Sequence, residues 1–492
     1  MDDSSKWEAF FMKVTRWFGL ITAFVLLFAV NGPSNVNAEE MKTLEDESIY
    51  DLLVDRFFNG DSTNDENIDI KDLSAFYGGD FAGIVDRLSY IGDMGFTIIS
   101  LGPIFHTETY DGSQVLNYNK LEPHFGSDVD LEKMIESIHQ KKMSVIADFP
   151  FSGVSPNHIW IKEGMFTGIP TEDGTIDWDS SDSLVKEALK NAVISFAEKH
   201  DLDGIRLTKI GNFDEAYMNE VIAAVKQVKP EMYVFTNEQH AADFDAIPNI
   251  EKMAALKQSF VEFDPDSSPL SLFEDKAETD FIQFDELTGP RFTFEMVEKR
   301  MFPPTRWKLA AAALFTLPGI PVMTYETEIA VTGEKAPVSH PVTNFKTDMA
   351  LTEFITDLNK LRNQSEALRN GDFELLYNDQ GFTVYKRSND KETWIVALNN
   401  RTVTSNIELP KEVVGENKKL RGVLDGDLVR ESKDGTFRIV LEREVAEIYI
   451  ADEDKGFNTP YLIASILVFT LFFIFIFAVL RRGKKGVKKE VK

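Results

Sequence analysis

Cysteine is absent from the 492-residue sequence, which excludes disulfide bonds and metal sites built on thiolates. Such a composition is compatible with export to a bacterial outer surface. Basic residues are also few, since 52 Lys and Arg face 81 Asp and Glu, and the net charge is −29. An acidic chain repels polyanions, so we exclude a nucleic-acid partner. The sequence also lacks internal repeats and low-complexity linkers.

What the sequence contains indicates a folded protein with more than one domain. Hydrophobic residues make up 43% of the chain and aromatic residues 12%, which is typical of globular rather than disordered proteins. Domains usually have about 100–250 residues. The length therefore accommodates one large domain and one smaller one.

The amino-terminal end resembles a secretory signal. Lys13 and Arg16 precede an apolar run over residues 17–30, and Val36-Asn37-Ala38 forms a small-residue cleavage site. We therefore predict a signal peptide over residues 1–38. The acidic residues before Met12 are unusual for such a signal and favour Met12 as the true start. An uncleaved amino-terminal anchor is the alternative, although the run is short for a membrane span.

The carboxyl-terminal end predicts a membrane helix. Residues 461–480 carry no charge and are rich in Leu, Ile, Phe and Val, which is about the length that crosses a bilayer. We place the transmembrane helix at 458–480. The basic tail 481–492 follows it, and the positive-inside rule puts this tail in the cytoplasm and the preceding chain outside. The expected location is a cell membrane with a single span.

The region between the two ends alternates strand-like and helix-like segments, which predicts β/α units around a parallel sheet. Amphipathic stretches at 131–142 and 184–200 have helical spacing. The sixth strand of an eight-stranded barrel, expected between Glu238 and Phe281, is not recognisable. Seven apolar, β-rich runs are assigned as barrel strands: Ile49–Val54, Thr97–Leu101, Ser144–Ala147, Gly204–Leu207, Tyr233–Phe235, Phe281–Phe284 and Ile320–Thr324.

From about residue 370 the pattern changes to short strands separated by turns, such as GFTVYKR and TWIVALNN. This change indicates a separate all-β module. We therefore divide the region into an α/β barrel domain at 39–369 and a β-sandwich domain at 370–452.

Several segments resemble the α-amylase family (glycoside hydrolase family 13), with most similarity to its cyclomaltodextrinase and cyclodextrin glucanotransferase branch. The resemblance implies a (β/α)8 TIM barrel with its site at the carboxyl ends of the strands, a short excursion after strand three and a β-rich carboxyl-terminal domain. It also implies an α-glucan or maltooligosaccharide as ligand. The motifs that carry it are IYDLLVDRFFNGDSTND, FYGGDFAGIVDRLSYIGDMGFTIISLGPIF, NYNKLEPHFGSDVDLEKMIESIHQKKMSVIADF, DLDGIRL and LFTLPGIPVMTYETEI.

A loop after the first strand is rich in calcium-type ligands. Calcium takes six to eight oxygen ligands from carboxylates, amides and backbone carbonyls, and similar loops in the cyclodextrin glucanotransferases bind calcium. An ordinary Asx-rich turn, which needs no ion, is the alternative. The resemblance implies the side chains or carbonyl oxygens of Asn59, Asp61, Asn64, Asp65, Gly78 and Asp80 as ligands.

Strand four departs from the catalytic pattern of the family. The sequence DGIRLT keeps Arg206 but has Thr208 where the family has its aspartate nucleophile. Retaining glycosidases of this type need two carboxylates about 5 Å apart. A threonine hydroxyl is not anionic at neutral pH and is a poor nucleophile without a dedicated base. Glu238, on strand five, matches the general acid.

Other positions around the expected site also differ. Asp148 is kept after strand three, but Ser152 and Gly153 stand where the family has Asn-His, and Ser113 replaces a tyrosine that stacks on the sugar. Near strand seven, one register puts Glu286, Leu287 and Thr288 in the places of the family's Asn-His-Asp. A second register puts Glu286 in the aspartate's place, so Glu286 stays a possible catalytic residue.

Two interpretations of these residues follow. In the first, Glu238 is held by Arg206 in a buried ion pair, and the protein binds glucan or a protein partner without cleaving it. In the second, Glu238 is the acid of an altered hydrolase, with a water molecule activated by another carboxylate. The candidates for that carboxylate are Asp214, Asp285 and Glu286.

Overall fold

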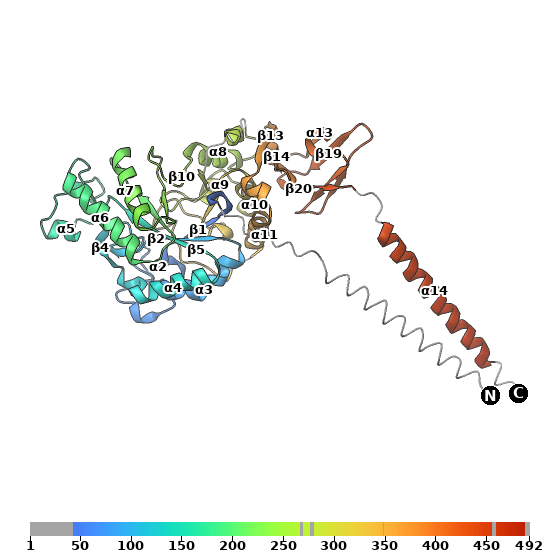
Figure 1. The fold of residues 1–492 in the computed structure, drawn as a ribbon, viewed down its shortest axis with the longest axis horizontal. Helices are drawn as coiled ribbons and strands as arrows, with labels where there is room; N and C mark the ends of the chain where they lie inside the picture. Colours follow the sequence, from blue (N-terminus) through green and yellow to red (C-terminus); the bar gives the residue numbers. More distant parts are fainter. Residues whose placement is uncertain (1–42, 266–268, 276–279, 348, 455–458, 488–492) are drawn as a thin grey trace. The chain divides into compact units, whose positions relative to one another are not determined.

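The computed structural model describes residues 43–265, 269–275, 280–347, 349–454 and 459–487 (Figure 1). The predicted signal peptide and the end of the basic tail lie outside these residues. The first described element is the 3-10 helix η1 (Leu44–Asp46), which leads into strand β1.

Eight parallel strands form the barrel predicted from the sequence. Their order in the sheet is β10-β11-β12-β1-β2-β5-β8-β9, and a parallel bridge between Phe235 and Ala246 links the two edges. The fold class is therefore confirmed as a TIM barrel. The strands are β1 (Ile49–Asp51), β2 (Ile98–Pro103), β5 (Ser144–Pro150), β8 (Gly204–Thr208), β9 (Tyr233–Thr236), β10 (Ile247–Pro248), β11 (Asp280–Ile282) and β12 (Ile320–Thr324).

The limits of most strands differ by one to three residues from the predicted ranges, and two strands depart from the prediction for a clear local reason. The sixth strand, β10, has only two residues, one of them a proline, and such a short segment gives no β-pattern in the sequence. The first strand was predicted to reach Val54, but it ends at Asp51 because the chain turns into the short helix α2 (Val54–Phe57).

Amphipathic helices cover the outside of the barrel and bury their apolar faces against the strands. α4 begins with a capping box in which Ser127 and Asp130 exchange side-chain-to-backbone hydrogen bonds. The larger helices are α3 (Phe81–Asp93), α4 (Asp128–Gln140), α6 (Ser183–Lys199), α7 (Glu215–Val228), α8 (Ile250–Phe260), α9 (Phe292–Glu298), α10 (Pro303–Thr316) and α11 (Ala350–Gln364).

Shorter elements lie in the loops of the barrel. After β2 comes the hairpin of β3 (Phe105–Thr107) and β4 (Val115–Leu121). The predicted short excursion after β5 contains α5 (Ile159–Lys162) and a hairpin of β6 (Ile169–Pro170) and β7 (Ile176–Asp177). The remaining short helices are η2 (Ser62–Asn64), η3 (Pro123–Phe125), η4 (Pro269–Glu274), η5 (Thr327–Ile329), α12 (Glu366–Asn370) and α13 (Lys411–Val414).

The all-β domain follows α12, as the sequence pattern predicted. It has a six-stranded antiparallel sheet and a two-stranded pair, and apolar residues from both, such as Ile395 and Phe437, share one core. The sheet contains β13 (Asp372–Asp379), β14 (Phe382–Ser388), β15 (Thr393–Asn399), β20 (Val445–Glu453), β17 (Lys418–Gly422) and β18 (Leu428–Arg430), and the pair is β16 (Ser405–Pro410) with β19 (Thr436–Leu441).

Buried polar contacts hold the barrel against the β domain. Arg306 of α10 donates to the side chain of Asn400 and to the carbonyl oxygen of Phe260. Arg387 of β14 donates to the carbonyl oxygen of Thr316 at 2.7 Å. Because breaking a buried charged hydrogen bond leaves its partner unsatisfied, these contacts tie the two domains together.

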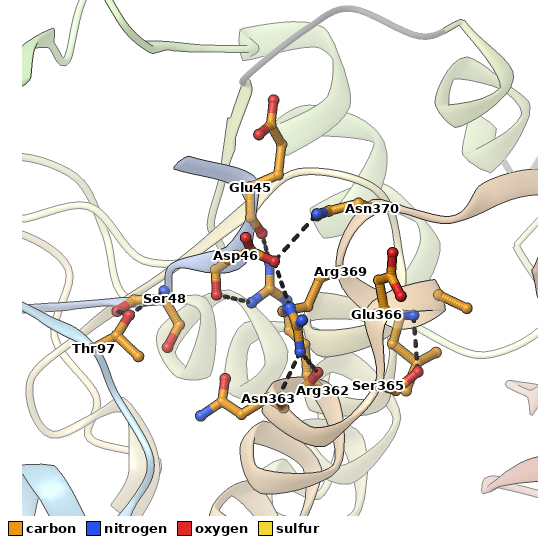
Figure 2. Close-up of polar contacts among 12 residues, drawn as sticks. Glu45, Asp46, Ser48, Thr97, Arg362, Asn363, Ser365, Glu366, Arg369 and Asn370 are labelled. Atoms are coloured by element: carbon orange, nitrogen blue, oxygen red, sulfur yellow. Dashed lines mark hydrogen bonds and ion pairs between the residues drawn. The ribbon is translucent and has the colours of Figure 1, made fainter. Parts of the chain in front are cut away.

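A second arginine cluster fixes the segment that enters the first strand (Figure 2). Arg362 of α11 donates to the carbonyl oxygens of Glu45 and Asp46, at 2.5 and 3.2 Å. The Asp46 carboxylate accepts hydrogen bonds from Arg369 at 2.5 Å and from Asn370 at 3.1 Å. This network joins the start of the barrel to the helices that lead into the β domain.

The carboxyl-terminal part of the described chain is a single apolar helix. α14 spans Thr459–Val487, and its segment Leu462–Leu480 has a mean hydropathy of 3.0 with none of it buried. By length and composition this helix is long enough to cross a membrane.

Candidate active site at the carboxyl ends of the barrel strands

Arg206 lies at the centre of the barrel and is bound by two carboxylates. Its Nε and Nη2 atoms donate to Asp148 of β5 at 2.7 and 2.9 Å. Its Nη2 and Nη1 atoms donate to Asp51 of β1 at 2.9 and 3.3 Å. All three side chains are buried. The structure therefore brings together two residues that the sequence identified, Arg206 and Asp148, with a third that it did not, Asp51.

Burial and charge act in opposite directions on this group of residues. Burial raises the pKa of Asp148, although the neighbouring Arg206 guanidinium opposes that rise. Burial alone lowers the pKa of Arg206, but the carboxylates of Asp148 and Asp51 outweigh burial and raise it above its usual range. Arg206 therefore stays cationic, with two buried carboxylates as its counter-charges.

Thr208 is the last residue of β8 and is buried. Residues two apart on a strand point to the same face, so Thr208 and Arg206 share one side of β8. Its carbonyl oxygen accepts a hydrogen bond from the Phe151 N–H at 2.8 Å, which fixes the end of β8 beside β5. β8 thus ends in a buried hydroxyl group rather than a carboxylate.

Glu238 lies just beyond β9 and is only partly buried. Its carboxylate accepts hydrogen bonds from the backbone N–H groups of Ile210 and Gly211, at 3.0 and 3.4 Å. The predicted ion pair between Glu238 and Arg206 is wrong, because the four hydrogen bonds of Arg206 go to Asp51 and Asp148. Asp51, which the sequence analysis overlooked, takes the place expected for Glu238.

The three other candidate carboxylates differ in their surroundings. Asp214 caps the start of α7 and pairs with Lys186 at 3.1 Å on the surface. Asp285 is buried, accepts the Phe292 N–H and the Thr327 hydroxyl, and lies 3.8 Å from Arg291. Both therefore have structural partners. Glu286 is partly exposed and lies 3.9 Å from Lys257.

A buried network beside the site was not found from the sequence. Arg56 stacks on the ring of Tyr110 at 3.6 Å, and the Tyr110 hydroxyl contacts His340 Nδ1 at 2.9 Å. His340 Nε2 contacts the carbonyl oxygen of Leu287 at 2.5 Å. An imidazole therefore occupies the strand-seven region, but it comes from a distant segment. No local sequence pattern connects position 340 with position 287.

The predicted calcium loop is largely satisfied by its own hydrogen bonds. The Asn59 amide donates to Asp65 at 2.8 Å, and Asp80 accepts backbone N–H groups, including that of Asp61 at 2.8 Å. Within the described residues, no group of three or more acidic or histidine side chains is placed to hold a metal ion. One feature fits a cation ligand set, because the buried Oδ1 atom of Asn64 has no hydrogen-bond partner.

Part of the same loop borders a cavity of about 320 Å³, which is open to one side. Asp61, Asn64 and Asp80 from the loop line it, together with Asp130 of α4. Gly78 adopts a φ of +87°, and a β-carbon there would lie 2.4 Å from an oxygen atom of Asp65. Glycine is thus required for the backbone to approach Asp65 this closely.

These features define a class of protein: a (β/α)8 barrel with a carboxyl-terminal β domain and acidic residues at the carboxyl ends of its strands, as in glycoside hydrolases of the TIM-barrel type. Comparison with known proteins agrees. Residues 51–179 match the α-amylase catalytic domain, and residues 371–449 match the α-amylase carboxyl-terminal domain.

Individual relatives are similar over most of the chain. The crystal structure of an Anoxybacillus α-amylase is 33% identical, covers 85% of this chain and 100% of its own, and superposes with a TM-score of 0.80. A cyclomaltodextrinase of Geobacillus thermopakistaniensis is 25% identical over 77% of this chain and 72% of its own length. The β/α-amylase of Paenibacillus polymyxa is 26% identical, but the chain spans only 35% of that protein.

The chain belongs to the α-amylase family (glycoside hydrolase family 13). The similarity to a cyclomaltodextrinase agrees with the branch that the sequence motifs indicated.

Two buried acids follow β12 near the site. Glu326 has a left-handed φ of +68°, which is unusual for a non-glycine residue, and its Oε1 accepts the Asn344 N–H at 2.6 Å. Burial raises the pKa of Glu326 to about 8. Burial also raises the pKa of Glu328, whose Oε1 accepts the Tyr50 hydroxyl at 2.6 Å.

This burial predicts a pH dependence of stability. The unfolded chain ionises Glu326 near its ordinary pKa of 4.5, whereas the folded chain resists ionisation up to about pH 8. Stability is therefore fully present below pH 4.5 and is lost as the pH rises through 8. Glu326→Gln should remove this loss. Its free energy of unfolding, relative to that of the wild type, should therefore rise by a few kcal/mol from pH 5 to pH 9, since one pKa unit is about 1.4 kcal/mol.

Chemical denaturation at the two pH values measures this difference. Glu334→Gln is the matched control, because Glu334 is exposed. Equal pH dependence in the wild type and in Glu326→Gln would show that Glu326 is not the buried acid responsible.

Proposed function

We propose that this chain is a membrane-anchored member of the α-amylase family that binds α-glucan, such as a maltooligosaccharide, without efficient cleavage. The observation that carries the proposal is the end of β8, where Thr208 stands at the position that the family resemblance assigns to the nucleophile and Arg206 is bound by Asp51 and Asp148. Membership of the family, and the similarity to a protein named cyclomaltodextrinase, support an α-glucan as the ligand.

The chemistry of this site explains why cleavage is impaired. Retention requires a carboxylate that attacks the sugar carbon while a second carboxyl group protonates the leaving oxygen. Thr208 cannot supply the first group, and Asp51 and Asp148 are both engaged by Arg206. Loss of a single catalytic residue from such a set commonly costs a factor of about 10⁴ or more.

The alternative is an active hydrolase with an altered pair of carboxylates. The partial exposure of Glu238 favours it, because within the described part of the chain this carboxylate is hydrogen-bonded by backbone N–H groups alone and can reach a ligand. Its second carboxylate would be Glu286, which is partly exposed, rather than Asp214 or Asp285, which have structural partners. An inverting reaction would then use water as the nucleophile.

Hydrolysis assays separate the two functions. The full-length chain, purified in a detergent without a sugar headgroup, should release no more product from maltoheptaose than Glu238→Gln does. Product chromatography makes the measurement, and Glu286→Gln should also leave the result unchanged. Thr208→Asp alone should restore little activity, because Ser152, Gly153 and Thr288 leave the sugar without its expected hydrogen-bond partners.

Robust hydrolysis that disappears in Glu238→Gln would refute the impaired site. The stereochemistry of the product would then identify the mechanism, since inversion requires an activated water molecule and retention requires a nucleophile.

Calcium is the proposed cofactor, held by the side chains of Asn59, Asp61, Asn64, Asp65 and Asp80 and by the Gly78 carbonyl. The unpaired Oδ1 of Asn64 and the approach of Gly78 to Asp65 support this set. The ion would stabilise the loop that leads into α3. An ion at a hundredfold excess over its Kd stabilises the native state by about 2.7 kcal/mol. Chelation should therefore lower the melting temperature.

The control for this prediction is Asp61→Ala, whose melting temperature should no longer respond to the chelator. If the wild type melts at the same temperature with and without chelator, the loop is an ordinary Asx-rich turn.

The proposed location is a cell membrane, with the barrel outside and the basic end of the chain in the cytoplasm. The apolar segment Leu462–Leu480 and the basic residues after it support this topology. A proteinase added to intact cells should remove residues 39 to about 455 and leave a small fragment, detected with an antibody against residues 481–492. Complete protection of the barrel would show the opposite orientation.

A further inference from the structure

Lys209 follows Thr208 at the mouth of the barrel and has no role in the site described so far. Its backbone φ is +51°, which is costly for a residue with a side chain. Its side chain is partly buried beside the end of β8. A strained backbone conformation of this kind persists only where the surrounding structure fixes it in place.

The side chain of Lys209 fills space beside Gly153. Gly153 has a φ of +67°, and a β-carbon added there would lie 2.8 Å from Lys209 Nζ, 3.0 Å from Cδ and 3.4 Å from Cε. The three nearest atoms all belong to Lys209. The volume that a side chain at position 153 would need is therefore occupied by the lysine.

The ammonium group also bridges to a different segment. Lys209 Nζ donates a hydrogen bond to the carbonyl oxygen of Ser113 at 3.1 Å, and Ser113 lies in the loop between β3 and β4. Gly153 and Ser113 are the two positions at which the α-amylase pattern has a histidine and a sugar-stacking tyrosine. Lys209 thus contacts two of the residues at which this chain differs from the family pattern.

Carboxylates on several segments attract the ammonium group. Burial lowers the pKa of Lys209, and the carboxylates of Asp111, Asp173, Asp177 and Glu238 oppose this effect. These acids come from the β3–β4 loop, from the β6–β7 hairpin and from the segment after β9. Attraction to carboxylates on several segments favours keeping the ammonium group in the mouth.

We propose that Lys209 is a specificity-determining residue that closes the deepest part of the barrel mouth to a sugar ring. The side chain takes the place beside Gly153, and its bond to Ser113 holds two segments of the mouth together. A glucan then reaches only the outer part of the mouth, away from the end of β8. This inference extends the proposed glucan binding, on which it rests, by naming the residue that limits it.

Calorimetric titration of the full-length chain with maltoheptaose, in a detergent without a sugar headgroup, tests the proposal. Lys209→Ala should bind the oligosaccharide about tenfold more tightly than the wild type, because it opens space for one sugar ring. Lys209→Gly, which relieves the positive φ, provides a second variant if Lys209→Ala does not fold. Lys226→Ala, which removes a lysine paired with Asp245, should bind like the wild type.

A double-mutant cycle tests the contact without any ligand. Gly153→Ala introduces the same backbone strain in the wild type and in Lys209→Ala, so only the clash with the lysine differs between the two. Gly153→Ala should therefore lower the melting temperature several degrees more in the wild type than in Lys209→Ala.

The outcomes of the two experiments are distinct. Equal maltoheptaose affinity in the wild type and Lys209→Ala, or tighter binding by the wild type, overturns the role of Lys209 and leaves the proposed function standing. If neither protein binds maltoheptaose, the proposed glucan binding fails, and the double-mutant cycle then tests the role of Lys209. A larger decrease in melting temperature on Gly153→Ala in the wild type supports the closed mouth, and equal decreases overturn it.

Discussion

A guanidinium group inside a β-barrel needs counter-charges, and in this protein the counter-charges come from the first and third barrel strands. Arg206 binds Asp51 of β1 and Asp148 of β5. One cation therefore links β8 to its neighbour β5 and to β1, which lies two strands beyond β5 in the sheet. Since two carboxylates already neutralise Arg206, a neutral residue such as Thr208 can end β8 without leaving the arginine unpaired. The neutral Thr208 at the end of β8 and the unexpected Asp51 are therefore two parts of one charge arrangement.

This arrangement also separates Glu238 from the arginine. Glu238 is bound by backbone N–H groups of the loop after β8, and the Lys209 side chain fills the space beside Gly153 in the same mouth. The barrel retains the architecture of a sugar hydrolase, while its central residues contact one another. Fold and catalytic function are separable in general, because the fold depends on the strands and helices and the function on a few side chains.

The fold could be predicted because long periodic segments specify it. The strand Ile320–Thr324 has its predicted limits, whereas β10 was missed because two residues carry no periodicity. At the site, Arg206, Asp148 and Thr208 could be located because they lie on recognisable strands. Asp51 lies in an apolar run that gives no sign of a charged site. His340 comes from a segment distant in the sequence, and the position of the Lys209 side chain depends on an unusual backbone angle. Such contacts depend on the tertiary structure, which local patterns do not contain.

The most direct measurement is a double-mutant cycle between Thr208→Asp and Asp51→Asn, followed by chemical denaturation. In the wild type, Thr208→Asp places a third carboxylate beside an arginine that already has two, so it should destabilise the protein. In the Asp51→Asn background one of the two original carboxylates is a neutral amide, so the cost of Thr208→Asp should fall by about 1–3 kcal/mol. An equal cost in both backgrounds would contradict the account, because it would mean that Asp51 does not supply the charge that β8 lacks.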